Sequence, residues 1–360
     1  MTVTSAPSES SVGVARGHIR LRGPRVRIGH ARDLNWLRRI VPMLIGVAAL
    51  AALILGIDPQ GFQRAIQHLD LRLIPAIVAV SVAYYVLQGI RWHQLLRCVG
   101  VKLRMRETVL LNFGGQATAL LPLGELTRAV LVTEATAADF GTVVATVTVQ
   151  ELLYTMVLIV FAVPGLLTVQ HAFAGVVAAL GLTGLIFVAL TWCPAYQRLR
   201  WMVARIPGLR RFIAEVDQLH NDTVLLLRHR STLTGCWISA LQAAATITAL
   251  WLVARAVAPG ALTWENAALV FAVSNVAGAL SLIPGGIGAY EASVVGLLAS
   301  FGINPGVAAA IAVLQRLADK GLATALGFAG YAVARRTLHV SGLGTLPTRP
   351  PAEKAEPQAA

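Results

Sequence analysis

Six long apolar runs limit this chain to one class of structure. They cover residues 40–57, 71–90, 142–163, 171–192, 233–258 and 306–333. Each is about as long as the helix that crosses ~30 Å of hydrocarbon. The chain is 56% hydrophobic and only 13% charged, with a mean hydropathy of +0.68, which leaves too little charge for the surface of a soluble domain. The sequence therefore predicts an all-α polytopic membrane protein with about six full transmembrane helices.

The formal net charge of +13 is unevenly distributed along the chain. Arginine and lysine gather in residues 1–39, 91–106, 193–232 and 335–336, whereas residues 58–70, 164–170, 259–265 and 302–305 contain only Arg64. Connections rich in arginine and lysine face the cytoplasm. We therefore expect a multi-pass protein of the cell membrane with both termini cytoplasmic. Anionic lipid headgroups are the expected partners of the basic connections, and nucleic acid is not expected.

Three regions follow from this pattern. Residues 1–38 form a basic tail and residues 336–360 a second tail rich in proline and alanine, and both are expected to be disordered and cytoplasmic. Residues 39–335 form the transmembrane domain. Within it, Asp58-Pro59 predicts the start of a short helix in 58–70, and the amphipathic stretch 209–228 predicts a helix on the membrane surface.

Two further apolar segments, residues 108–135 and 266–301, are interrupted by glycine and proline. The second contains SLIPGGIGAYEAS at residues 281–293. Non-helical backbone at membrane depth is tolerated only when it is buried in protein or lines a wet cavity. The segments therefore predict two re-entrant helical hairpins, although hydropathy leaves paired spans open. The predicted turn residues are Asn112, Gly115, Pro122 and Gly124 in the first hairpin, and Asn275, Pro284, Gly285, Gly286 and Gly288 in the second.

The two broken segments resemble each other, and so do the spans that follow them. Asn112, Gly115, Pro122, Gly124 and Glu125 occur in the same order as Asn275, Gly278, Pro284, Gly288 and Glu291, and Gln150, Glu151 and Tyr154 align with Gln315, Arg316 and Asp319. This order predicts a duplication of residues 108–163 and 266–333. The first copy starts from the cytoplasm and the second from outside, so the copies are expected to be inverted. Inverted repeats with broken helices are typical of transporters, and a role in packing alone is the alternative.

Among the ionisable side chains in these segments, six are candidate site residues: Glu125, Arg128, Glu151, Glu291, Arg316 and Asp319. A charge at the bilayer centre costs on the order of 3 kcal/mol, so such groups pair with one another or face water. We expect one polar centre in which the two arginines are balanced by the four acids and bind the substrate. Arg316 and Asp319 share a helix face at i, i+3. A structural ion-pair network and a capping role for Glu125 and Glu291 remain alternatives.

Other chemistry finds little support in the sequence. No pair of His, Cys, Asp or Glu has metal-ligand spacing, so no metal, no cofactor and no catalytic residue is predicted. Cys98, Cys193 and Cys236 give no disulfide framework. Arg91 and Trp92, which follow the run 71–90, are expected to be interfacial anchors.

The run LNFGGQATALLPLGELTR, the later PGGIGAYEAS and the final span with Arg316 resemble the lysylphosphatidylglycerol synthase transmembrane-region family, also called flippase-like integral membrane proteins. The resemblance covers roughly residues 40–335. It implies translocation of a lipid with a charged or glycosylated headgroup between the leaflets of the cytoplasmic membrane. We expect the soluble synthase domain of the bifunctional family members to be absent, because only residues 334–360 follow the last span.

The chain also departs from the family pattern. Family members commonly carry a Glu-Arg pair followed by Asp in the third span, where this chain has Gln150-Glu151 and then Tyr154. This difference bears on the identity of the substrate, which is expected to be a phospholipid or a lipid-linked molecule. The alternative function is a membrane enzyme, or a subunit of one, in lipid-linked sugar or aminoacyl-lipid metabolism. Whether the chain forms a homo-oligomer stays open.

Overall fold

A computed structural model describes residues 58–119, 124–166, 193–205, 213–228, 230–281, 284–338 and 340, together with the single positions 177, 181, 184 and 188. The predicted span 40–57, most of the predicted span 171–192, nearly all of both tails, and Pro122 lie outside these residues. The described residues form helices and turns, and no strand occurs among them.

The described elements in chain order are α2 (Pro59–Gln67), the 3-10 turn η1 (Leu71–Leu73), α3 (Ile74–Cys98), α4 (Met105–Gln116), the 3-10 turn η2 (Gly124–Leu126), α5 (Thr127–Thr136), α6 (Phe140–Leu166), α8 (Cys193–Arg205), α9 (Ile213–Arg228), α10 (Arg230–Thr234), α11 (Cys236–Val257), α12 (Trp264–Leu280), the 3-10 turn η4 (Pro284–Gly286), α13 (Ala289–Ser300), α14 (Pro305–Arg316), the π-helical turn η5 (Leu317–Gly321) and α15 (Leu322–Leu338).

Three described helical stretches are long and apolar enough to cross a membrane. They are Leu71–Cys98, Phe140–Leu166 and Cys236–Val257, and they correspond to the predicted spans 71–90, 142–163 and 233–258. The prediction of an α-helical membrane protein is therefore confirmed. The expected helix in 58–70 is α2, which begins where the side chain of Asp58 accepts a hydrogen bond from the Gly61 N–H at 2.9 Å.

The expectation for Arg91 and Trp92 is wrong. Helix α3 continues beyond them to Cys98, and both side chains are fully buried. Nη2 of Arg91 donates to the carbonyl of Thr232 at 2.6 Å, and Nε1 of Trp92 donates to Thr146 Oγ1 at 2.8 Å. Both residues are therefore internal, because α3 packs against other helices where the sequence pattern predicted an interface.

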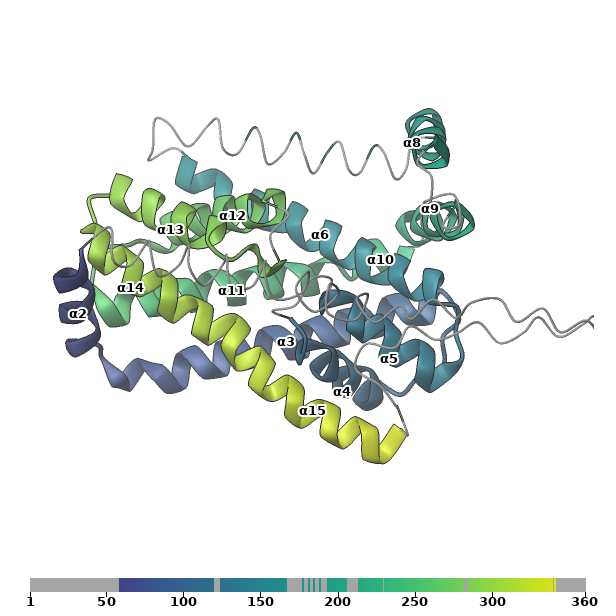
Figure 1. Cartoon of the computed structure of the whole chain (residues 1–360), viewed down its shortest axis with the longest axis horizontal. Helices are drawn as coiled ribbons and strands as arrows, with labels where there is room; N and C mark the ends of the chain where they lie inside the picture. The colour runs from purple at the N-terminus through teal and green to yellow at the C-terminus, as the bar shows by residue number, and fades with distance from the viewer. Residues whose placement is uncertain are drawn as a thin grey trace, which may run out of the picture.

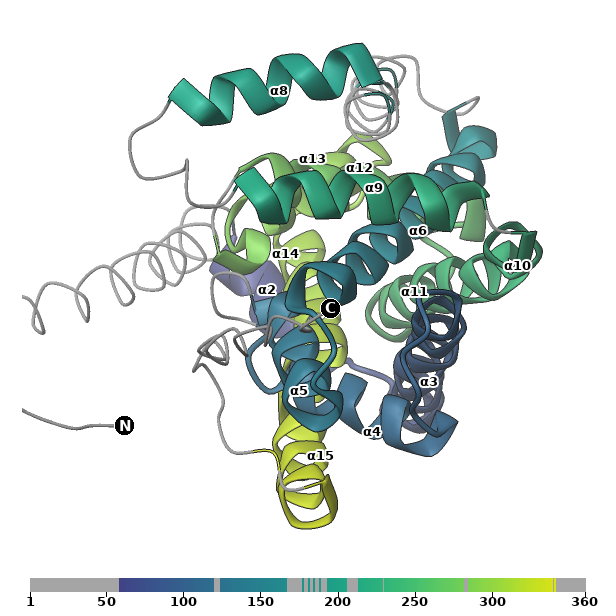
Figure 2. The ribbon, with the colours of Figure 1, turned by 90° about the vertical axis from the view of Figure 1, so that its right-hand side faces the viewer.

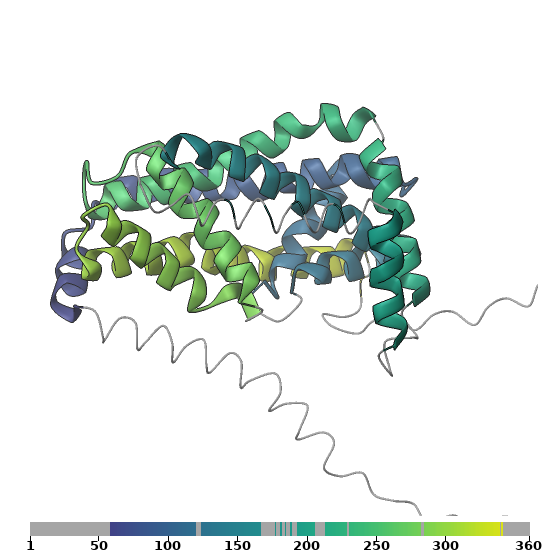
Figure 3. The ribbon, with the colours of Figure 1, turned by 90° about the horizontal axis from the view of Figure 1, so that it is seen from above.

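The long helices run along one axis of the molecule, and short helices lie across its two ends (Figure 1). Helix α2 packs against α14 at one end, and α9 packs against α6 at the other. Helices α8 and α9 lie side by side across that second end (Figures 2 and 3). The predicted amphipathic stretch 209–228 coincides with α9, whereas α8 was not predicted.

Both broken segments are helical hairpins. Helices α4 and α5 pack against each other around η2, and α12 and α13 pack against each other around η4. The second turn contains Gly285, Gly286 and Gly288 at positive φ, a conformation that favours glycine. The first hairpin lies in the half of the molecule that carries α9, and the second lies toward α2 (Figures 1 and 3).

The predicted final span is a helical run from Pro305 to Leu338 that contains a π-helical turn. This turn, η5, follows Arg316 directly and includes Asp319. Beyond it, α15 packs closely against α4 of the first hairpin. A Cβ atom added at Gly327 would lie 2.2 Å from the backbone nitrogen of Ala117, so the two helices touch through their backbones.

Candidate functional site

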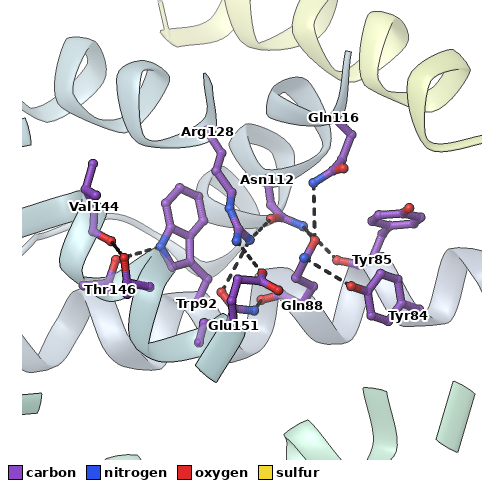
Figure 4. Close-up of polar contacts among 12 residues, drawn as sticks. Tyr84, Tyr85, Gln88, Trp92, Asn112, Gln116, Arg128, Val144, Thr146 and Glu151 are labelled. Atoms are coloured by element: carbon purple, nitrogen blue, oxygen red, sulfur yellow. Dashed lines mark hydrogen bonds and ion pairs between the residues drawn. The ribbon is translucent and has the colours of Figure 1, made fainter. Parts of the chain in front are cut away.

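Arg128 is the centre of the first polar cluster (Figure 4). It lies on α5 and is 0% exposed. Its Nη2 lies 2.7 Å from Oε1 of Glu151 on α6, and its Nη1 donates to Asn112 Oδ1 at 3.2 Å and Gln150 Oε1 at 3.4 Å. The guanidinium carbon lies 5.3 Å from the centroid of the Trp92 ring. The arginine therefore has a counter-charge, two neutral acceptors and an aromatic face around it.

The side chain of Gln88 extends this cluster across α3 (Figure 4). Its Oε1 accepts hydrogen bonds from Asn112 Nδ2 at 3.2 Å and Gln116 Nε2 at 3.4 Å. Its backbone carbonyl accepts one from Gln150 Nε2 at 2.9 Å. Gln88 was not predicted as a site residue. Its signal in the sequence is a polar residue one helical turn before Trp92 in an otherwise apolar segment.

Arg316 and Glu291 form the second polar cluster. Nε of Arg316 lies 2.8 Å from Oε1 of Glu291, without the alignment of a hydrogen bond, so the contact is an ion pair. Nη2 of Arg316 donates to the carbonyl of Gly285, and the guanidinium carbon lies 4.9 Å from the centroid of the Tyr290 ring. The Glu291 side chain is 0% exposed and that of Arg316 is 14% exposed. The pair thus attaches the turn of the second hairpin to α14.

Glu291 also caps α13. Its Oε2 accepts the backbone N–H of Gly288 at 2.6 Å, at the start of that helix. The capping role and the pairing role, which the sequence offered as alternatives, therefore occur together in one carboxylate.

Asp319 belongs to the first cluster rather than to Arg316. The hydroxyl of Tyr85 donates to Asp319 Oδ1 at 2.6 Å, and the carbonyl of Tyr85 accepts from Asn112 Nδ2 at 3.0 Å. The i, i+3 argument assumed an α-helix, but the backbone becomes π-helical directly after Arg316. Consequently Arg316 contacts the second hairpin while Asp319 contacts α3.

The six expected site residues thus do not form one centre. Arg128, Glu151 and Asp319 lie in or beside the first cluster, and Arg316 and Glu291 form the second. The side chain of Glu125 lies outside the described residues. The direct contacts fall into two sets because each hairpin packs against the helix that follows it. The turn η5 connects the two sets, since Arg316 directly precedes it and Asp319 lies at its middle.

Several predicted turn residues lie against these clusters. Asn112 is part of the first cluster, and a Cβ atom added at Gly115 would lie 2.5 Å from Cβ of Arg128. A Cβ atom at Gly124 would lie 1.8 Å from the carbonyl oxygen of Thr118, so the first turn also requires glycine. Asn275 is half-buried on α12. Pro284 is described by its backbone only, in η4.

Chemistry other than ion pairing is sparse in this region. Within the residues that the structure describes, no group of three His, Cys, Asp or Glu side chains is close enough to hold a metal ion. The arrangement can offer two arginine guanidinium groups and three carboxylates to a charged ligand. Both arginines pair through planar guanidinium groups, which suit a phosphate or a carboxylate.

Long apolar helices, two broken hairpins and two Arg–Glu pairs, each with one fully buried member, define a polytopic helical membrane protein. Residues 39–327 match the family described as the lysylphosphatidylglycerol synthase TM region, and the chain therefore belongs to that family. The resemblance found in the sequence is thereby confirmed. This membership, together with the apolar helices, indicates a membrane location.

Two curated relatives come from Methanothermobacter thermautotrophicus, and both are called UPF0104 membrane protein. One is 22% identical over 324 residues, which cover 82% of this chain and 93% of the relative. The other is 25% identical over 314 residues, which cover 80% of this chain and 93% of the relative. The similarity therefore extends through nearly the whole of both relatives and supports a membrane protein related to lipid metabolism or lipid transport.

Proposed function

We propose that this protein translocates a lipid with a charged or glycosylated headgroup between the two leaflets of the cell membrane. The observation that carries the proposal is the pair of ion pairs, Arg128–Glu151 and Arg316–Glu291, each of which joins a broken hairpin to the next helix. A headgroup that crosses the bilayer needs charged partners at membrane depth, and such residues are otherwise costly there.

The depth of Glu151 supports this role. It lies near the middle of α6, which has 27 residues and is therefore about 40 Å long. Its side chain is 40% exposed, while that of its partner Arg128 is 0% exposed. An acid that is accessible near mid-membrane is the group of this cluster that an incoming headgroup meets first.

The hairpins are proposed to be re-entrant. Helices α4 and α13 have 12 residues each and α5 has 10, so they are about 15–18 Å long. This is about half of the ~30 Å that a full crossing requires. A helix that begins at mid-membrane has backbone N–H groups at its start that attract anions.

The two halves are proposed to be inverted repeats. Each consists of a broken hairpin followed by a long helical run, and the hairpins lie toward opposite ends of the molecule (Figure 1). In this arrangement the basic connections face the cytoplasm, α2 lies outside, and both termini are cytoplasmic. Alternating exposure of the two Arg–Glu pairs would then carry a headgroup from one leaflet to the other.

The proposal includes neither a catalytic step nor a cofactor. The test is a translocation assay with the purified full-length protein in proteoliposomes. Fluorescent lipids with anionic, zwitterionic, aminoacylated and glycosylated headgroups would be compared for protection from a membrane-impermeant quencher. We expect the wild-type protein to bring lipids of one headgroup class to the outer leaflet faster, so that the quencher reaches them sooner. We expect Arg316→Ala not to accelerate this movement. A folded wild-type protein that moves none of these lipids faster than protein-free vesicles would overturn the proposal.

A further inference from the structure

A concave surface lies away from both ion pairs, at the corner where α3 ends and α4 begins. It is a cavity of about 790 Å³ that is open to the outside, and its polar lining residues are His93, Arg97, Lys102, Arg104 and Glu107. Neither member of either Arg–Glu pair lines it. Because it is open, a ligand there would be held mainly by charge at its surface.

The lining of this corner cavity is strongly cationic. Arg97, Lys102 and Arg104 supply three permanent positive charges, and Glu107 is the acid among the lining residues. No described residue forms an ion pair with any of the three cations. The Glu107 carboxylate is already engaged, because its Oε2 accepts the backbone N–H of Arg104 at 2.8 Å. The cavity therefore attracts an anion.

The backbone at the corner favours an anion as well. Helix α4 begins at Met105, which lines the cavity, so the positive end of that helix faces it. The carbonyl groups at the C-terminal end of α3 are already hydrogen-bonded. Those of Leu96 and Arg97 accept hydrogen bonds from the N–H groups of residues 99–101. Few unsatisfied carbonyls are therefore left there to repel a negative group.

The wall beneath the cavity is rigid. His93 is buried, and its Nδ1 lies 3.1 Å from Oγ1 of Thr108, which fixes α3 against α4. The next residue inward, Trp92, packs on Arg128. A second cavity of about 650 Å³ shares Gly100, Lys102 and Glu107 with the first and extends to Asp139 and Leu338.

We propose that the corner cavity binds a phosphate group, carried either by an anionic lipid headgroup or by a small soluble phosphate compound. Arg97 and Lys102 are the principal phosphate ligands, and the start of α4 supplies backbone N–H groups. The site does not depend on lipid translocation, because its ligand can bind without crossing the membrane.

The experiment uses the purified full-length protein and a pair of matched variants. Arg97→Ala/Lys102→Ala removes two exposed charges at the cavity, and Arg335→Ala/Arg336→Ala removes two exposed charges at the end of α15, outside it. Binding is measured in one arm with phosphatidylglycerol titrated into phosphatidylcholine nanodiscs. The second arm titrates inorganic phosphate against detergent-solubilised protein at constant ionic strength, with chloride as the control.

The cavity variant is expected to bind phosphatidylglycerol at least about tenfold more weakly than the wild type, because two charge-assisted contacts to the phosphate are lost. The α15 variant should lose less than about twofold. The charge-keeping variant Arg97→Lys/Lys102→Arg should bind as the wild type does, which separates loss of charge from misfolding. Saturable binding of inorganic phosphate that the cavity variant loses identifies a soluble phosphate as a ligand. Binding in the lipid arm alone identifies a lipid headgroup. Equal losses in both alanine variants, or no loss in either, would overturn the proposal.

Discussion

Nε of Arg316 lies 2.8 Å from Oε1 of Glu291, and this pair carries its charges in the opposite order to Arg128 and Glu151. In the first half, the arginine is on the second helix of the hairpin and the acid is on the helix that follows. In the second half, the acid is on α13 and the arginine is on α14. Each pair is therefore neutral by itself, although the two halves place the arginine on different helices.

Replacing Glu291 by Gln should destabilise the protein and stop translocation. The amide oxygen can still accept the Gly288 N–H, but Arg316 loses its counter-charge. Breaking a buried pair from one side costs about 3–5 kcal/mol, and we expect the lower end because Arg316 is partly exposed. Thermal unfolding in detergent and lipid translocation in vesicles measure the two effects.

The double variant Glu291→Gln/Arg316→Gln serves as the control. It should recover part of the lost stability, because no isolated charge remains, yet it should not recover translocation. If the double variant is less stable than Glu291→Gln alone, the stability lost in Glu291→Gln comes from the altered helix cap and not from the unpaired Arg316.

Replacing Glu151 by Gln should also lower both stability and translocation. Arg128 keeps its hydrogen bonds to Asn112 and Gln150, but it stays fully buried without its counter-charge. We expect a stability loss of about 3 kcal/mol, the lower end for a broken buried pair, because these neutral acceptors remain, and a fall in the translocation rate of about tenfold or more. The matched control is Glu265→Gln, an exposed acid in the first turn of α12, which should leave translocation unchanged. If Glu151→Gln translocates lipid at the normal rate, the carboxylate of Glu151 does not contact the substrate.

Two glycine substitutions should have opposite effects on stability. A methyl group at Gly327 would meet the backbone of Ala117 at 2.2 Å, so Gly327→Ala should separate α15 from α4 and cost about 1–3 kcal/mol. Gly296 lies in α13 with no atom within 4 Å of an added Cβ, so Gly296→Ala should raise stability by about 0.5–1 kcal/mol. Thermal unfolding of both variants checks the sign of each change. Equal effects would contradict the close contact.

The contact between α8 and α9 should weaken in acid. Asp217 accepts a hydrogen bond from Tyr196, and its Oδ1 lies 2.8 Å from Nε of Arg200, and these contacts hold the pKa of Asp217 below its ordinary value of 3.8. Because the folded pKa is the lower one, this stability is present above pH ~4 and is lost as the pH falls through the folded pKa. Hydrogen exchange of α8 should accelerate over that window, and Asp217→Asn should remove the pH dependence. If hydrogen exchange of α8 still accelerates in acid in Asp217→Asn, the pH dependence comes from another group.

Cysteine labelling tests the proposed orientation. Ala261 is exposed between α11 and α12, and Met105 is exposed at the start of α4. In a background without native cysteines, a membrane-impermeant maleimide should label Ala261→Cys in intact cells, and Met105→Cys only after permeabilisation. Labelling of Met105→Cys in intact cells would reverse the topology on which the inverted repeat depends.

The positions of the hairpins were predictable because the signals are local. Glycine and proline interrupt apolar sequence, and the structure has its breaks at η2 and at η4, where Gly285 and Gly288 take positive φ. It was also predictable that the charged side chains in these segments would have partners, since burying a charge costs free energy whichever helix carries it.

The choice of partners was not predictable from local pattern. Which acid meets which arginine depends on how α5 packs on α6 and α13 on α14, and the geometry with which consecutive helices pack is not written in the local pattern. The π-helical turn that separates Arg316 from Asp319 leaves no mark in the hydrophobic pattern. Arg91 has the sequence context of an interfacial anchor, and only the position of the Thr232 carbonyl shows why it is buried.

The close packing of α15 on α4 has a consequence for how the protein is made. Helices α4 and α5 are synthesised early, but the surface that covers α4 near Ala117 comes from Gly327, close to the end of the described chain. Until the ribosome has produced α15, the first hairpin lacks its partner at this close packing contact. Assembly of the first half therefore has to wait for the last helix of the second, and a chain truncated before residue 322 should be recognised by membrane quality control as unfinished.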